Sequence, residues 1–202
     1  MKTLARTAVA LCLLWVAGCA TQVTSEVTTF HRLASPNGET IAVVPTDEAK
    51  TGGIEFNDYA AKVAAQLSEI GFKPVASDEN PQILARFDYG VGPGETHVRS
   101  LPDNYVHYHF YYGHPRAWYL GTWWDEPEVY SYTVYPRYLD LTLIRASDGE
   151  VLFEGHVKSA GREDNMNEVV DYLIDAMFQN FPGESGVTKI VTIRKGDDDR
   201  PM

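Results

Sequence analysis

Residues 138–157 read YLDLTLIRASDGEVLFEGHV, and the pattern of this stretch predicts a β-hairpin. Apolar residues alternate with polar ones on both sides of Asp148-Gly149, as expected for two strands that each bury one face. Asp-Gly is a dipeptide that favours the tight turn of a hairpin. The side chains expected to face inward are Leu139, Leu141, Leu143, Val151, Phe153 and Val157.

Two segments outside this hairpin have the periodicity of amphipathic helices. In residues 54–72 apolar side chains recur every three or four positions, and Gly71 is a typical helix stop. Residues 161–183 show the same periodicity, with Asn165 and Glu168 at the spacing of a capping box. Each helix is therefore expected to bury one face.

Three further segments have the character of strands. Residues 40–47 form a short β-branched run that predicts a strand buried on both faces, while residues 83–91 alternate like a half-buried strand. Residues 187–194 predict a last strand. Together the segments indicate an α+β fold, a mostly antiparallel β-sheet with two amphipathic helices packed on one face. We assign residues 27–194 to this single domain; the strand order does not follow from local patterns.

The N-terminal residues indicate export and lipid attachment. Lys2 and Arg6 precede an apolar run that is too short to span a bilayer, and the run ends in Val-Ala-Gly before Cys19. This junction resembles the bacterial lipobox, in which the chain is cut before the cysteine and the cysteine is acylated. We therefore expect residues 1–18 to be a signal peptide and residues 19–26 to be an acylated cysteine and tether. Ordinary secretion with an incidental cysteine is the alternative.

The expected lipid attachment also predicts a location. Ala20, rather than Asp, follows Cys19. By resemblance to lipoprotein sorting in enterobacteria, this favours the outer membrane of a Gram-negative bacterium, with the protein facing the periplasm. The covalent lipid on Cys19 is the only attached group that the sequence predicts, and no other cofactor is expected.

The charge of the chain excludes one class of partner. The formal net charge is −11 at pH 7, and loss of Lys2 and Arg6 with the signal would make the mature chain more negative. Nucleic acid is not an expected partner, because its binding depends on clustered Lys and Arg. Electrostatic docking on anionic lipid is disfavoured for the same reason. Residues 195–202 form an acidic tail that we expect to be disordered.

A long aromatic excursion, at about residues 92–128, separates the predicted strands. Its centre, residues 105–124, reads YVHYHFYYGHPRAWYLGTWW. Tyr and Trp offer large, rigid contact area with one polar group, so we interpret the stretch as a surface that binds an envelope protein or a glycan. The residues expected to make contact are Tyr111, Tyr112, Trp118, Trp123 and Trp124.

Two other interpretations of the excursion stay open. The first is a loop that covers the exposed face of the sheet, where Tyr130, Tyr132 and Val134 would meet it. The second is a metal site. His107 and His109 would lie on one side of a strand and His114 would approach from a loop, and neutral imidazoles of this kind bind Zn²⁺ or Cu²⁺.

No catalytic motif is present in the sequence. It contains no His-Glu-x-x-His motif, and the residues around Ser185 lack the spacing of a nucleophile elbow. We therefore predict a protein without enzymatic activity, which serves as a binding or cell-envelope maintenance module. The oligomeric state does not follow from these patterns.

Several segments together resemble bacterial lipoproteins that carry the domain of unknown function 4136. The matching features are the lipobox, the helix and strand over residues 60–92, the hairpin over residues 138–161, and a helix that ends in Phe181-Pro182. The chain departs from the family where Phe153-Glu154 stands in place of Trp-Arg, and its excursion has fewer glycines and more His and Trp. The resemblance covers about residues 27–183. It implies the fold and a membrane-anchored location, and it implies no activity.

Overall fold

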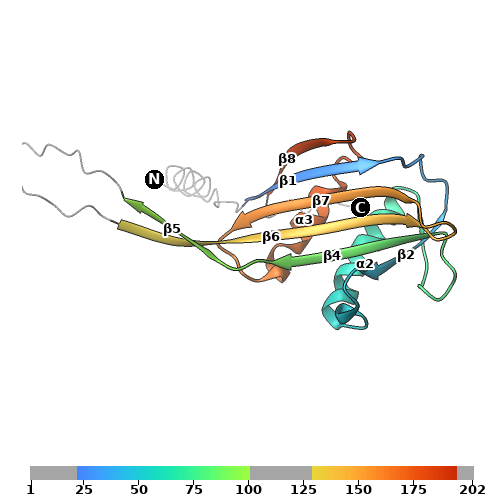
Figure 1. The fold of residues 1–202 in the computed structure, drawn as a ribbon, viewed down its shortest axis with the longest axis horizontal. Helices are drawn as coiled ribbons and strands as arrows, with labels where there is room; N and C mark the ends of the chain where they lie inside the picture. The colour runs from blue at the N-terminus through green and yellow to red at the C-terminus, as the bar shows by residue number, and fades with distance from the viewer. Residues whose placement is uncertain (1–21, 101–128, 195–202) are drawn as a thin grey trace, which may run out of the picture.

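The computed structural model describes residues 22–100 and 129–194, which form one α+β domain (Figure 1). Two α-helices and two short 3₁₀ helices accompany eight strands in this part of the chain. The strands are β1 (Gln22–His31), β2 (Thr40–Pro45), β3 (Lys73–Pro74), β4 (Ile83–Val91), β5 (Glu95–Ser100), β6 (Val129–Arg145), β7 (Val151–Gly161) and β8 (Val187–Arg194). The helices are η2 (Glu48–Lys50), α2 (Ile54–Glu69), η3 (Met166–Glu168) and α3 (Val170–Phe178).

The strands form a mixed sheet in the order β3-β2-β4-β6-β7-β1-β8, and β5 pairs with β6 outside this order. β2 runs parallel to β3 and β4, with α2 as the connection between them, and the other pairs are antiparallel. A parallel pair needs such a crossover, because a short turn cannot return the chain to the same end of the sheet. The prediction of a mostly antiparallel sheet is confirmed.

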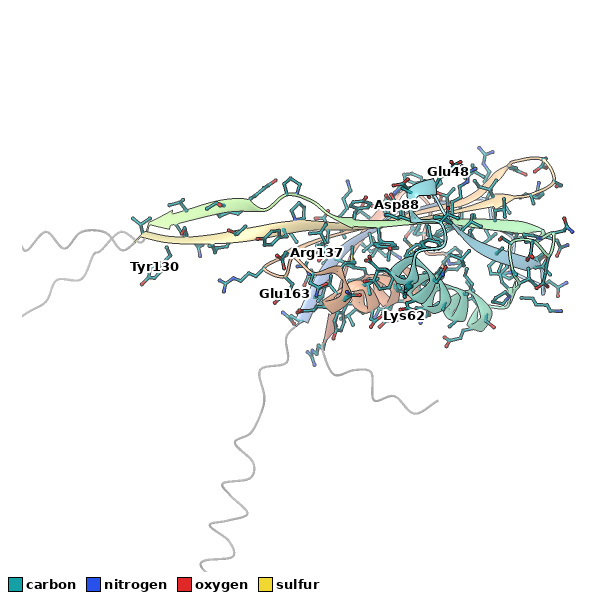
Figure 2. The ribbon with its side chains drawn as sticks, turned by 90° about the horizontal axis from the view of Figure 1, so that it is seen from below. Glu48, Lys62, Asp88, Tyr130, Arg137 and Glu163 are labelled. Carbon is teal, nitrogen blue, oxygen red and sulfur yellow. The ribbon has the colours of Figure 1, made fainter. Side chains whose placement is uncertain are left out.

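Both α-helices pack on one face of the sheet, as predicted (Figure 2). α2 contacts β2 and β3, while α3 contacts β7, β1 and β8. Alternate residues of the strands supply the other half of the core. The fully buried side chains include Phe87, Phe153, Ile41, Leu67, Leu139, Leu141, Leu143, Leu173, Ile174, Met177, Val63 and Val157. In β4 and β6 the apolar residues of the sequence pattern are therefore the buried ones, and the polar residues between them face the other side of the sheet.

The predicted hairpin is β6–β7, and one of its inward positions is wrong. Leu143 pairs with Phe153, but Ile144 pairs with Val151, so β7 has one extra residue at this point. Such a bulge shifts the alternation by one position. As a result Val151 is exposed, whereas the sequence pattern predicted that it faces inward.

The second helix begins later than predicted. Asn165 caps the short η3 turn, where its side chain accepts a hydrogen bond from the backbone N–H of Asn167. The α-helix α3 starts only at Val170. Its N-cap residue is Val169, whose side chain cannot form a capping hydrogen bond. The capping-box spacing of Asn165 and Glu168 therefore marks a 3₁₀ turn and not the first turn of α3.

The segment predicted as a tether belongs to the sheet. Residues 22–26 are the first half of β1, which lies between β7 and β8. The sequence pattern is weak here because Ser25 and Thr29 occupy core-facing positions where apolar residues would mark a strand. The domain therefore includes residues 22–26, which the sequence pattern assigned to the tether.

Candidate functional site

The lipidation, metal and binding residues that the sequence predicts lie outside the described ranges. They are Cys19, the histidines His107, His109 and His114, and the aromatic residues Tyr111, Tyr112, Trp118, Trp123 and Trp124. Among the residues that the structure does describe, no group of three His, Cys, Asp or Glu is placed to hold a metal ion. None of the helices in these ranges is long and apolar enough to cross a membrane.

The structure does locate the two ends of the aromatic segment. β5 pairs with the first six residues of β6, from Glu95↔Val134 to Ser100↔Val129. Ser100 and Val129 thus form the last pair within the described residues, and they hold the two sides of residues 101–128 next to each other. Part of the predicted excursion, residues 95–100, is therefore strand.

β5 and residues 129–134 of β6 form a two-stranded ribbon that projects beyond the main sheet (Figure 1). β6 is long enough to serve both structures, since its later residues pair with β4 and β7. Six residue pairs span about 17 Å at ~3.4 Å per residue. The ribbon therefore holds both ends of the aromatic segment well beyond the hydrophobic core.

Glycines allow the chain between β4 and β5 to lie close against β6. A Cβ at Gly94 would lie 2.6 Å from Thr133 Cγ2, and a Cβ at Gly92 would lie 2.9 Å from Pro136 Cγ. Both contacts are closer than side chains allow. Close packing where the ribbon leaves the sheet therefore favours glycine at positions 92 and 94.

The ribbon exposes apolar and aromatic side chains. Val98 is 67% exposed, Val129 61%, Tyr130 51% and Tyr132 38%. The ring of Tyr132 stacks on His97 with 5.5 Å between centroids, and the guanidinium carbon of Arg162 lies 5.7 Å from the same ring. Rings held in this way lose little conformational entropy when a partner packs on them.

The sheet face opposite the helices is mixed in character. On β6 and β7, His156 Nδ1 lies 2.7 Å from Asp140 Oδ1, and the side chains of Asp140 and His156 are 40% and 45% exposed. Phe30, Tyr138 and Ile190 alternate with core-facing residues of β1, β6 and β8, so they lie on this open face, and all three are exposed. An antiparallel sheet can leave such a face in water.

A lysine joins the short helix η2 to β4. The ammonium of Lys50, in η2, donates hydrogen bonds to Asp88 Oδ1 and to the backbone carbonyl of Tyr89. It also lies 4.2 Å from the centroid of the Tyr89 ring. These contacts fix η2 to β4. Because the ammonium group already has hydrogen-bond partners, we assign Lys50 a structural role.

One charged side chain lies inside the core. Arg137 of β6 is 5% exposed, and its Nε and Nη1 atoms have no hydrogen-bond partner among the described residues. Burial lowers the pKa of its guanidinium, and the negative charge of Glu163 partly opposes that shift. Pairing between strands aligns Arg137 with Ser159 and Ser25 across β6, β7 and β1. This polar row lies at the end of the core nearest the ribbon.

A cleft of about 750 Å³ lies at the opposite end of the sheet. Its walls come from the segments before β2, before β4 and around the β6–β7 turn, and they include Arg32, Glu39, Gln82 and Arg145. The size suits a small molecule. However, Arg145 is already paired with Asp148 and Glu150, so a ligand that used this cation would have to displace these carboxylates.

Comparison with known proteins identifies a family for the sequence. The family model for a domain of unknown function, DUF4136, matches residues 23–183. No curated protein matches the sequence significantly. The matched range runs from β1 to the end of the α3 segment, so it contains both the polar row and the ribbon.

Distant structural likenesses exist among solved proteins. A PDZ domain protein from Parabacteroides distasonis matches with a TM-score of 0.45 at 12% identity, over 91% of this chain and 41% of that protein. The chain thus spans about two fifths of that protein's length. A PelC dodecamer from Paraburkholderia phytofirmans matches with a TM-score of 0.40 at 12% identity, over 80% of this chain and 99% of PelC. Likenesses this distant carry no information about activity.

Proposed function

Because this chain belongs to the family of the domain of unknown function DUF4136, whose description names no activity, we propose its function from the geometry. The proposal is a non-enzymatic binding or maintenance module of the cell envelope. It is anchored through a lipid on Cys19 at the outer membrane, faces the periplasm, and binds a protein or glycan partner through an aromatic surface. The observation that carries the proposal is the ribbon, which holds both ends of the aromatic segment outside the core.

The direction of the ribbon supports binding over covering. The six β5–β6 pairs carry both ends of the aromatic segment about 17 Å beyond the main sheet, away from the open face. That face is mixed: covering Phe30, Tyr138 and Ile190 would remove apolar area from water, whereas covering Asp140 and His156 would cost desolvation energy. The character of the face therefore does not by itself favour a cover.

The chemistry of the segment fits a partner surface. Trp and Tyr are the residues that most often dominate binding energies at interfaces, and a buried patch of them excludes water around hydrogen-bonding groups. We assign the contacts to Trp118, Trp123 and Trp124, with Tyr111 and Tyr112 beside them.

An in-cell crosslinking experiment tests the proposal. A photoreactive residue replaces Trp118, and the same residue at Lys62 on α2 is the matched control, because the side chain of Lys62 is 45% exposed and lies on a different element. We expect a discrete envelope partner or glycan from position 118 alone. Crosslinks from position 118 only into the protein's own sheet would overturn the proposal and favour a cover over the open face.

A triple substitution gives an independent reading. Replacement of Trp118, Trp123 and Trp124 by Ala removes most of the proposed contact area and changes no residue of the described fold. We expect loss of the crosslinked partner and unchanged thermal unfolding. Retention of the partner by this variant would show that the aromatic segment is not the binding surface.

A further inference from the structure

We propose that the exposed faces of the β5–β6 ribbon contact the lipid surface of the membrane to which the protein is anchored. This inference rests on the proposed acylation of Cys19 and adds a partner for the ribbon itself. It is argued from the direction of the strands, the length of chain before β1 and the side chains of the ribbon.

The start of β1 and the ribbon lie at the same end of the sheet. β1 and β6 each pair antiparallel with β7, so they run in the same direction. Ser25, Ser159 and Arg137 lie on one line across these strands. Three residues before Ser25, β1 starts at Gln22. Three residues before Arg137, β6 reaches Val134, where the ribbon begins (Figure 1).

The chain before β1 is too short to move the sheet far from its anchor. Three residue steps separate Cys19 from Gln22, and they reach at most about 10 Å at ~3.3–3.6 Å per residue. The ribbon reaches about 17 Å beyond the same end of the sheet at ~3.4 Å per residue. An anchored molecule whose strands tilt toward the membrane would therefore lay the ribbon along the lipid surface.

The side chains of the ribbon suit the interface between lipid and water. Opposite residues of an antiparallel pair share a face, so Val98 lies on the face that Ser131 occupies, and Tyr132 lies with His97 on the other face. Val98, Val129, Tyr130 and Tyr132 are all exposed. Tyr is enriched where membranes meet water, because its ring is apolar and its hydroxyl is polar.

The charge of the ribbon also permits contact with lipid. Residues 95–100 and 129–134 contain one acidic residue, Glu95, and one basic residue, Arg99, whereas the whole chain carries −11. Contact through these residues therefore avoids the repulsion that an acidic surface would meet on anionic lipid. The attraction comes from burial of apolar area.

Site-directed fluorescence quenching tests this inference on the full acylated protein. Val98→Cys and Val129→Cys place an environment-sensitive fluorophore on the ribbon, and Val151→Cys places it at the opposite end of the sheet as the control. All three positions are exposed. The proteins are reconstituted into phosphatidylethanolamine–phosphatidylglycerol vesicles whose lipids carry a spin label near the headgroup.

We expect loss of fluorescence at Val98 and Val129 and none at Val151. If the protein floats with the vesicles but the three probes stay equally bright, the lipid contact is wrong and the anchor stands. If the protein does not float, the anchor proposed above is wrong and the lipid contact falls with it. Quenching at all three positions would also overturn the inference, because it would mean that the whole domain lies on the lipid.

Discussion

At the scale of single residues, Arg137 is an unusual component of the core. Its guanidinium is desolvated, and two of its nitrogen atoms have no acceptor among the described residues. A buried donor without a partner costs about 1–3 kcal/mol. The absence of a side chain at Gly161 leaves space for the guanidinium, since a Cβ there would lie 1.7 Å from Arg137 Nη2.

Replacement of this arginine should therefore stabilise the fold. Met keeps much of the aliphatic stem of Arg137 and removes the charged group, so we expect Arg137→Met to raise the free energy of unfolding by about 1–3 kcal/mol in urea titrations. Arg86→Met, at an exposed position of β4, is the control and should change stability by less than about 0.5 kcal/mol. A loss of stability in Arg137→Met would show that attraction to Glu163 outweighs the cost of burying the guanidinium.

Tyr59 gives the fold a dependence on alkaline pH. Burial, followed by the negative charge of Glu55, raises the pKa of Tyr59 to about 12, against about 10 for an unfolded chain. Between these values the unfolded state has lost the proton that the folded state keeps, so the free energy of unfolding falls as pH rises. Burial raises the pKa values of Tyr89 and Tyr138 too, so they add to the same slope.

The Tyr59→Phe variant should flatten this slope above pH 10, by at most about 1.4 kcal/mol per pH unit. At neutral pH the variant should lose about 1 kcal/mol, because the hydroxyl of Tyr59 donates to Asn167 Oδ1. Urea titrations at several pH values measure both effects. Parallel stability curves for the two proteins above pH 10 would contradict the assignment.

At the scale of elements, Gly155 sets how closely α3 approaches β7. A Cβ at this position would lie 2.5 Å from Met177 Sδ and 2.7 Å from Phe153 Cε1. We expect Gly155→Ala to lower the free energy of unfolding by about 1–3 kcal/mol through overpacking. Glu154→Ala, on the opposite face of the same strand, is the matched control.

A double-mutant cycle separates this contact from a general effect on the strand. In a Met177→Ala background the space for an extra methyl group exists, so the Gly155→Ala change should cost clearly less there. Equal costs in both backgrounds would mean that the helix contact is not the cause. The glycine that the sequence places at the end of the Phe153-Glu154-Gly155 run thus has a packing role.

A substitution in β1 can distinguish a strand from the tether that the sequence predicted for residues 19–26. Glu26 pairs with Lys158 on one side and with Ile190 on the other, so its backbone lies inside the sheet. Glu26→Pro should therefore lower the free energy of unfolding by about 3 kcal/mol or more, whereas a tether would tolerate proline without cost. Glu26→Ala controls for loss of the side chain, and thermal unfolding measures both variants.

At the scale of the whole molecule, the proposed anchor and the described domain make one prediction together. We expect Cys19→Ser to release the protein from membranes without any change in its thermal unfolding, because the domain starts at Gln22. Fractionation and circular dichroism measure these two properties. Continued sedimentation of the variant with membranes would mean that the lipid on Cys19 is not the attachment.

Local patterns were sufficient for elements that bury one regular apolar face. Leu139, Leu141 and Leu143 alternate with polar residues, and Asp148-Gly149 turns the chain between β6 and β7. The apolar stripe of α2 and the stop at Gly71 are equally local. The family resemblance drew on the same segments and is confirmed by the match over residues 23–183.

Tertiary contacts decided the features on which the functional proposals rest. β1 carries Ser25 and Thr29 toward the core, so no apolar alternation reveals it, and only its two neighbours make it a strand. The ribbon exists because β6 is longer than its partners in the main sheet and pairs with β5 beyond them. A periodic sequence reports which face of a segment is buried, but strand partners and the direction in which a ribbon leaves the sheet depend on contacts between residues far apart in the chain.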